Sequence, residues 1–160
     1  MRRSDREIKD IEGIIQVMEK CDVCRLAFYD GGYPYILPLN FGMQVHEDQI
    51  TLYFHGADEG KKYELMEKDN RVGFEMDCSH KLVMTGAKDS CSCTMEYESV
   101  VGRGRVEKVL DEEKFQALCL LMKHYHKEEC MFDKSVMPRT TVWKLTVEQV
   151  SGKIRKKKKK

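Results

Sequence analysis

The sequence predicts a mainly β protein, an antiparallel barrel of about six strands with helices at its periphery. Two observations lead to this class. Strand-like segments follow one another directly along the chain, whereas a doubly wound parallel sheet would alternate them with helices. The chain has 160 residues, 41% of them hydrophobic and 34% charged, which is typical of one globular domain and excludes a disordered or fibrous protein.

The first predicted element is a helix over residues 5–20. Ser4 and Glu7 have the spacing of a capping box, which marks a helix start. Apolar residues then recur with a helical period, at Ile8, Ile11, Ile14, Ile15 and Met18. One face of this helix is therefore expected to pack on the barrel.

A β-hairpin is predicted next. Residues 23–29 and 33–41 are strand-like and flank the turn sequence Asp30-Gly31-Gly32. Pro34 and Pro38 cannot donate to a sheet ladder, so the second strand is expected at an edge or a break of the sheet. Such a break leaves backbone groups free for something other than a neighbouring strand.

In the rest of the chain, apolar residues alternate in some segments, as in strands, and recur with a helical period in others. The predicted strands are 49–55, 71–77, 94–109 and 140–150. A short helix is predicted after Gly60 and a longer one over 111–125, and 78–92 is expected to be a loop. Gly102 and Gly104 interrupt the strand 94–109 and indicate a bulge or bend. Phe115, Leu118, Cys119 and Met122 are the expected core positions of the longer helix.

The charge distribution divides the chain. Net charge is +1, but basic residues concentrate at 153–160, so the remainder is acidic, which argues against a broad nucleic-acid-binding face. We therefore expect one domain over 1–152 and a basic, solvated and disordered tail over 153–160, although a lysine run of this kind could also contact RNA or an anionic membrane.

No apolar run approaches the ~20 residues of a membrane span, and the first residues lack a secretory signal. A cytoplasmic protein without membrane or nucleic-acid partners is expected.

Seven cysteines favour free thiols over a disulfide framework. The pairs Cys21/Cys24 and Cys91/Cys93 have spacings compatible with metal or redox chemistry. A zinc site would require both pairs to converge, and Cys24 begins an alternating strand in which a buried thiol is a small hydrophobe. We assign no metal.

The segment with the most chemical content is 52–62. A strand ends at His55, a glycine-containing turn follows, and Lys61 and Lys62 fall in the first turn of a helix. Lysine is unfavourable at the positive end of the helix dipole, so two lysines there indicate an anion, with Gly60 permitting close approach of a phosphate. Lysines that simply face solvent and pair with Glu59 or Glu64 are the alternative.

Motifs along nearly the whole chain resemble the nitroimidazole-resistance (Nim-type) branch of the pyridoxamine 5′-phosphate oxidase-like flavoproteins. They are Cys21-Asp22-Val23-Cys24-Arg25-Leu26, Tyr33-Pro34-Tyr35, Pro38-Leu39-Asn40-Phe41, Leu52-Tyr53-Phe54-His55, Gly60-Lys61-Lys62, Phe74-Glu75-Met76-Asp77 and Tyr97-Glu98-Ser99-Val100-Val101-Gly102. They occur in order and at compatible spacing from Met1 to about residue 153. The resemblance implies a six-stranded split β-barrel homodimer with FMN at the subunit interface.

The resemblance also implies roles for individual residues. Cofactor-binding positions carried over from the family are Leu37, Pro38, Leu39, Asn40, Tyr53, Phe54, His55, Gly60, Lys61, Lys62, Glu98, Ser99 and Trp143, the last three reaching the flavin of the partner subunit. His55 would be the catalytic residue, orienting substrate or donating a proton. A sole tryptophan in a strand is otherwise core or interface packing, and a lone strand-end histidine is often structural.

The implied activity is that of an FMN-dependent oxidoreductase, reducing a small electron-poor acceptor such as a 5-nitroimidazole-like nitroaromatic by a ping-pong mechanism. Gly102-x-Gly104 lies within a strand and lacks the following helix of a dinucleotide fingerprint, so no nicotinamide site is expected. Three alternatives stay open: a flavin-binding sensor or storage protein with little turnover, a pyridoxine-phosphate oxidase, and a haem-binding relative with His55 as axial ligand.

Overall fold

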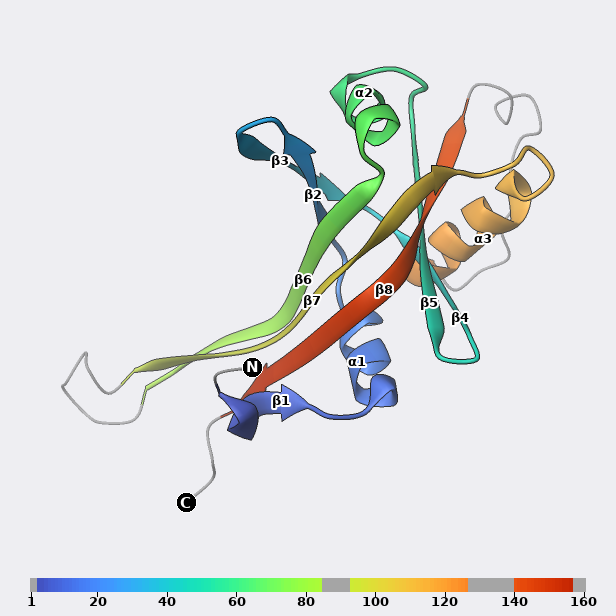
Figure 1. The fold of residues 1–160 in the computed structure, drawn as a ribbon. Coiled ribbons are helices and arrows are strands. Elements are labelled where there is room, and N and C mark those ends of the chain that lie inside the picture. The colour runs from blue at the N-terminus through green and yellow to red at the C-terminus, as the bar shows by residue number, and fades with distance from the viewer. Residues whose placement is uncertain (1–2, 85–92, 127–139, 157–160) are drawn as a thin grey trace.

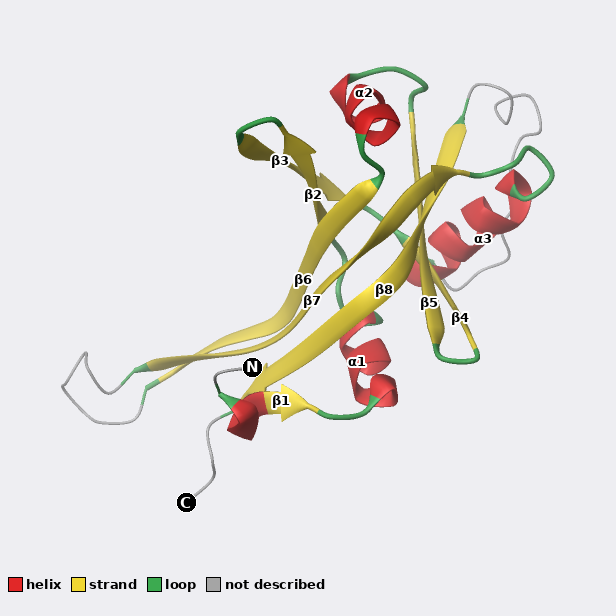
Figure 2. Ribbon diagram, viewed as in Figure 1, coloured by secondary structure: helices red, strands yellow, loops and turns green. Residues whose placement is uncertain are grey.

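In the part of the chain that the structure describes, one antiparallel sheet forms the body of the protein and α-helices lie around it (Figures 1 and 2). The computed structural model describes residues 3–84, 93–126 and 140–156. The strands are β1 (Glu7–Ile8), β2 (Cys24–Asp30), β3 (Tyr33–Leu39), β4 (Gly42–His46), β5 (Gln49–Gly56), β6 (Arg71–Val83), β7 (Thr94–Lys108) and β8 (Thr141–Arg155). The helices are a 3-10 turn η1 (Ser4–Arg6), α1 (Ile11–Met18), α2 (Lys61–Lys68) and α3 (Lys114–Tyr125).

The strand order is β3-β2-β6-β7-β8-β5-β4, with β1 paired to β8. No pairing among the described strands joins β3 to β4, so the sheet stays open between its two ends, as in a split barrel. The predicted fold class is therefore confirmed, while β1 and β4 are strands beyond the predicted six. Figure 1 shows α1 beside the β1 end of the sheet, α3 beside β4 and β5, and α2 at the far end of β6. No described helix is long and apolar enough to span a membrane.

The predicted hairpin is present. β2 and β3 pair from Asp30 opposite Tyr33 to Cys24 opposite Leu39. Gly31 has φ of 73°, a left-handed conformation that glycine adopts without strain. β3 is an end strand of the sheet, which is where its two prolines can be accommodated.

The helix predicted over 5–20 is wrong at its start. Residues 4–6 form a 3-10 turn and Glu7–Ile8 a short strand, and α1 begins only at Ile11. Asp10 is the true N-cap, because its carboxylate accepts a hydrogen bond from the Gly13 amide at 2.7 Å. The earlier residues pair with β8 instead, where Ile8 lies opposite Gly152 and fills the space that a side chain there would need.

The loop predicted over 78–92 is also wrong in its first part, because β6 continues to Val83 and pairs with β7 after a register shift between Cys78 and Lys81. Residues 85–92 lie outside the described residues. The bulge predicted at the glycines is confirmed by a register shift between Arg103 and Gly104. The basic tail begins later than expected, since Lys153 and Arg155 belong to β8; residues 157–160 are outside the described part.

The core fills the sheet's inner face. Trp143 is fully buried there, stacked on Phe54 with ring centroids 4.7 Å apart and tilted against Phe28 at 6.4 Å. On α3 the predicted core phase is partly wrong, because Ala117, Leu118 and Leu121 are buried whereas Phe115 is 49% exposed. Sequence periodicity alone did not fix which side of this weakly amphipathic helix meets β4 and β5.

Glu98 is a buried carboxylate, 3% exposed, that contacts two lysines. Lys20 at the end of α1 donates to it at 2.6 Å and Lys156 lies at 3.3 Å. Burial opposes ionisation, but the hydrogen bonds from Lys20 and Lys156 outweigh it and lower the pKa of Glu98 below its usual 4.5. This cluster ties the chain's C-terminal strand to α1.

We expect Glu98→Gln to lower the free energy of unfolding at pH 7 by about 1–3 kcal/mol, because a buried charge pair loses one partner. Because the folded-state pKa of Glu98 is lowered, its ionised form stabilises the protein above pH 4.5, and this contribution is lost as the pH falls further. The difference in unfolding free energy between the wild type and Glu98→Gln should therefore be smaller in acid. Urea unfolding at pH 7 and pH 4 measures both effects. Glu148→Gln is the control, because its pair with Arg105 is exposed. Equal gaps at the two pH values would contradict this role for Glu98.

Candidate functional site

The start of α2 is held in a defined turn after β5. The Tyr63 amide donates to the Gly60 carbonyl at 3.0 Å, and the Tyr63 hydroxyl donates to the Ala57 carbonyl at 2.6 Å. Gly60 has φ of 114°, which disfavours any side chain, and a Cβ built there meets nothing within 4 Å. The helix start therefore borders open space that a ligand group can approach closely.

The two predicted lysines differ in their partners. Lys61 forms an ion pair with Asp30 at the β2–β3 turn and lies 5.3 Å from the centre of the Tyr35 ring. The hydrogen bond to Asp30 raises the pKa of Lys61. The structure thus brings Lys61 against the hairpin that carries part of the predicted site.

Lys62 is half-buried and lies over Gly56, its Nζ 3.5 Å from where a Cβ on that glycine would stand. It also lies 4.5 Å from the centre of the Tyr63 ring. Within the described part of the chain, no carboxylate is within ion-pair distance of Lys62. A half-buried ammonium beside a helix start and without an anionic partner fits a phosphate group.

His55 and Tyr53 share one face of β5, whereas Phe54 points into the core, as strand alternation requires. His55 is exposed and pairs with Val142 of β8 one residue before Gly56. The Tyr53 hydroxyl donates to Gln44 Oε1 at 2.9 Å, and burial raises the pKa of Tyr53. Of these three residues, only His55 is exposed, and it lies next to the lysine site.

The β3 segment has two faces. Leu37 and Leu39 are half-buried and pack against the core, while Pro38 is exposed on the opposite face. Asn40 is exposed, and its side-chain amide donates to the Asp22 carbonyl at 3.1 Å. Its amide therefore has a structural partner within this chain.

The other predicted positions lie elsewhere in the chain. Trp143 is in the core, and its Nε1 has no hydrogen-bond partner among the described residues. Glu98 faces Lys20, and Ser99 lies opposite Asp77 and Lys153, toward the β1 end of the sheet. Gly56, beside which Lys62 lies, pairs with Thr141 of β8, whereas Ser99 pairs with Lys153, 12 residues further along that strand. At about 3.3 Å per residue the two places are on the order of 40 Å apart along β8, so one chain does not bring Glu98 and Ser99 to the lysines.

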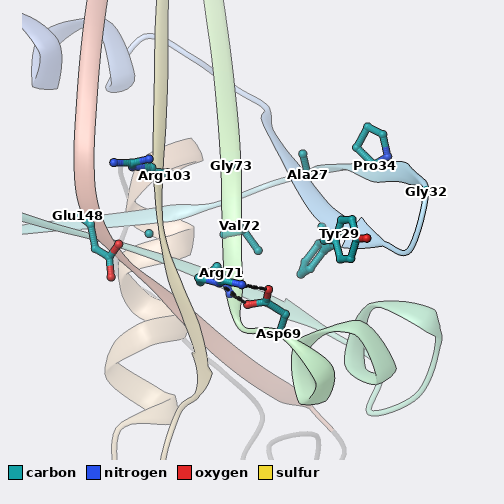
Figure 3. Close-up of a pocket in the computed structure, with 12 residues that line it drawn as sticks. Ala27, Tyr29, Gly32, Pro34, Asp69, Arg71, Val72, Gly73, Arg103 and Glu148 are labelled. Carbon is teal, nitrogen blue, oxygen red and sulfur yellow. Dashed lines mark hydrogen bonds and ion pairs between the residues drawn. The ribbon is translucent and has the colours of Figure 1, made fainter.

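Sequence reasoning missed a cleft of about 720 Å³ on the outer side of the sheet (Figure 3). Tyr29 and Pro34 of the hairpin form one wall, and Gly73 on β6 and Arg103 on β7 lie across from them. Figure 3 also shows the pair of Asp69 and Arg71, joined at 2.6 Å, which lowers the pKa of Asp69 to about 2. The signal in the sequence that could have indicated this cleft is a pair of small outward-facing residues, Ala27 and Gly73. They lie opposite each other and leave a hollow between longer side chains.

In the described ranges, no cluster of three or more histidine, cysteine or acidic side chains could hold a metal ion. Cys24 is fully buried in β2, and Cys91 lies outside the described residues.

Comparison with known proteins identifies the family. A family model described as pyridoxamine 5′-phosphate oxidase matches residues 10–154. The structure of a candidate 5-nitroimidazole antibiotic resistance protein from Bacteroides thetaiotaomicron is 35% identical, with a TM-score of 0.79 over 92% of this chain and 86% of that one.

Two further solved structures are similar. A FAD-binding protein from Mesorhizobium loti is 26% identical, with a TM-score of 0.65 over 94% of this chain and 98% of that one. A FAD and haem binding protein from Mycobacterium smegmatis shares the fold at 17% identity, with a TM-score of 0.79 over 95% of this chain and 74% of that one. No curated protein matches the chain. The family model and the 35% identical structure together show that the chain belongs to the pyridoxamine 5′-phosphate oxidase-like family and resembles its nitroimidazole-resistance branch.

Proposed function

We propose that this protein is an FMN-dependent oxidoreductase that reduces small electron-poor acceptors, such as nitroaromatic compounds. Its family membership and the flavin named for the Mesorhizobium loti relative support a flavin cofactor. The 35% identical relative supports nitroaromatic acceptors as the class to test first. A bound flavin would supply the redox chemistry, taking reducing equivalents from a donor and passing them to the acceptor.

The observation that carries the proposal is Lys62. Its half-buried ammonium lies beside Gly56 and the start of α2 with no carboxylate in ion-pair range in the described chain, so a ligand phosphate would complete its coordination. Lys61 would either leave Asp30 to bind the phosphate or contact both groups at once. The open space at Gly60 would let the phosphate approach the helix start. One phosphate suits this single helix start, which favours FMN over the longer FAD.

The other site residues receive distinct roles. The backbone of Leu37, Pro38 and Leu39 on the edge strand would border the flavin ring, because an edge strand has backbone groups free. Tyr53 and Phe54 would hold β5 in place, Asn40 would keep the β3 end fixed through Asp22, and His55 would orient the acceptor and hold or give a proton. This last role makes His55 the catalytic residue of the proposal.

A second copy of the chain would complete the site. Exposed apolar side chains gather on the outer side of β2, β3 and β7, at Tyr29, Ile36 and Val101, which are 65%, 56% and 54% exposed. A homodimer would cover them. Ser99 lies on this same outer side of β7, two residues from Val101, from where it could reach the partner's flavin, with its neighbour Glu98 supporting it from the interior. Trp143 pairs with Lys108 at the other end of β7 and would support the site through the core beneath Phe54.

The test begins with the visible spectrum of the purified protein and identification of the chromophore released by heat. Flavin absorption with released FMN is expected; released FAD would correct the cofactor, and a Soret band would replace the proposal with a haem protein. A flavin spectrum without reduction of nitroaromatics or quinones under any donor would favour a sensor or storage protein.

His55→Ala should then retain flavin but lower turnover of a nitroaromatic by about 10²-fold or more, the usual contribution of a proton donor. Steady-state kinetics against pH measures this, with flavin content checked by absorbance. His46→Ala is the matched control, because His46 is an exposed histidine on the neighbouring strand and pairs with Gln49, six residues along β5 from His55. Wild-type turnover in His55→Ala would return His55 to a structural role.

A further inference from the structure

Two cysteines far apart in sequence meet where α1 ends against β6. Cys21 follows α1, and Cys78 lies on the inner side of β6. Both thiols donate to the same acceptor, the Val17 carbonyl, at 3.2 Å from Cys21 Sγ and 3.9 Å from Cys78 Sγ. The two side chains also interact directly with each other. The proposed flavin site uses neither thiol.

The backbone at Cys78 has room to adjust. Cys78 is the last residue paired with β7 before a register shift, and pairing resumes at Lys81. The following residue, Ser79, has φ of 59°, an uncommon conformation for a residue with a side chain. Ser79 and His80 therefore lie outside the ladder, and a bulge of this kind loosens the backbone directly after Cys78.

The surroundings distinguish the two thiols. Cys21 is 1% exposed, and burial, with Cys78 nearby, raises the pKa of Cys21. Cys78 is partly exposed, so an oxidant in solution can reach its sulfur. Cys78 is thus the sulfur that meets an oxidant first, and Cys21 the one placed to react second.

We propose that Cys21 and Cys78 form a reversible redox pair that a hydroperoxide converts to a disulfide. The Cys78 thiolate attacks one peroxide oxygen, the O–O bond breaks, and the product is a sulfenic acid plus water from hydrogen peroxide or an alcohol from an organic peroxide. The Cys21 sulfur then displaces the sulfenic hydroxyl, which leaves as water with the Cys21 proton. Two thiols are oxidised, one peroxide is reduced, and a dithiol reductant reverses the bond by exchange.

The experiment uses the full-length protein, reduced and then given one equivalent of hydrogen peroxide. After alkylation of remaining thiols and digestion with trypsin, mass spectrometry should find peptide 21–25 joined to peptide 72–81, two hydrogens lighter than the separate peptides. Dithiothreitol should restore both. Because Cys24 shares the first peptide, Cys24→Ala is the matched control and should keep the link, whereas Cys78→Ser and Cys21→Ala should abolish it.

Three results would overturn the proposal: both cysteines fully alkylated after peroxide, a link that disappears in Cys24→Ala, or a link to peptide 21–25 that persists in Cys78→Ser. If Cys21→Ala fails to fold, the wild-type peptide map and the variants at the other two positions still decide. The assay reads sulfur chemistry alone, so it holds whether or not the protein binds a flavin.

Discussion

Replacing both Lys61 and Lys62 with alanine is expected to weaken FMN binding by about a hundredfold or more. Each charge-assisted contact to a phosphate contributes about 1.5–3 kcal/mol, and every 1.4 kcal/mol is a factor of ten in affinity. Lys62→Ala alone should cost more than Lys61→Ala, because Lys61 already pairs with Asp30 whereas Lys62 has no such carboxylate among the described residues. Fluorescence titration of the flavin-free protein measures all three affinities.

Two controls separate phosphate binding from general damage. Lys68→Ala removes an exposed lysine from the last turn of the same helix and should leave the affinity unchanged. Riboflavin lacks the phosphate, so the double variant should bind it as the wild type does and lose the preference for FMN. If FMN affinity in the double variant equals that of the wild type, the phosphate is held elsewhere, and the outer cleft beside Arg71 and Arg103 becomes the next place to look.

Gly104→Ala is expected to have the largest effect on stability, about 3 kcal/mol or more. A Cβ at Gly104 would lie 2.0 Å from the Thr146 carbonyl oxygen and 2.9 Å from its carbon, both backbone atoms of β8. Backbone cannot move aside as a side chain can, so β7 and β8 would have to separate at the bulge. Urea unfolding monitored by Trp143 fluorescence measures the loss.

Gly73→Ala is the matched control, on the adjacent strand of the same sheet. A Cβ there would meet only the Gly102 carbonyl oxygen, at 3.9 Å, which is ordinary contact. Alanine should therefore change the unfolding free energy by less than about 1 kcal/mol. Similar losses in the two variants would mean that the cost comes from glycine's place in a strand and not from the clash with β8.

Much of the fold could be predicted because its signals are local. The Asp30-Gly31-Gly32 turn, the prolines of the edge strand and the alternation in β5 each depend on neighbouring residues, and each is present in the structure. The break at Gly104 belongs to the same class. Wrong boundaries arose where two local signals competed, as at Ser4 and Asp10, both good helix caps.

Other features depend on contacts across long sequence separations. The sequence of β4 has no local signal that marks it as a strand. Gly42 lets this part of the chain pass directly against α3, because a Cβ at Gly42 would lie 2.4 Å from the Leu121 amide nitrogen. The extension of β6 beyond residue 77 exists because β7 is there to pair with it. Periodicity within either segment contains no information about such a partner.

The candidate site divides in the same way. The sequence by itself determined the family, the split-barrel class and the lysines at the start of α2, because motif order and the helix-start pattern are properties of the chain. Only the tertiary structure decided that Lys61 meets Asp30, that Glu98 is buried between two lysines, and that Cys21 and Cys78 share one carbonyl. Each of these pairs joins segments brought together by the sheet order, and burial and distance between such segments arise only when the whole core has packed.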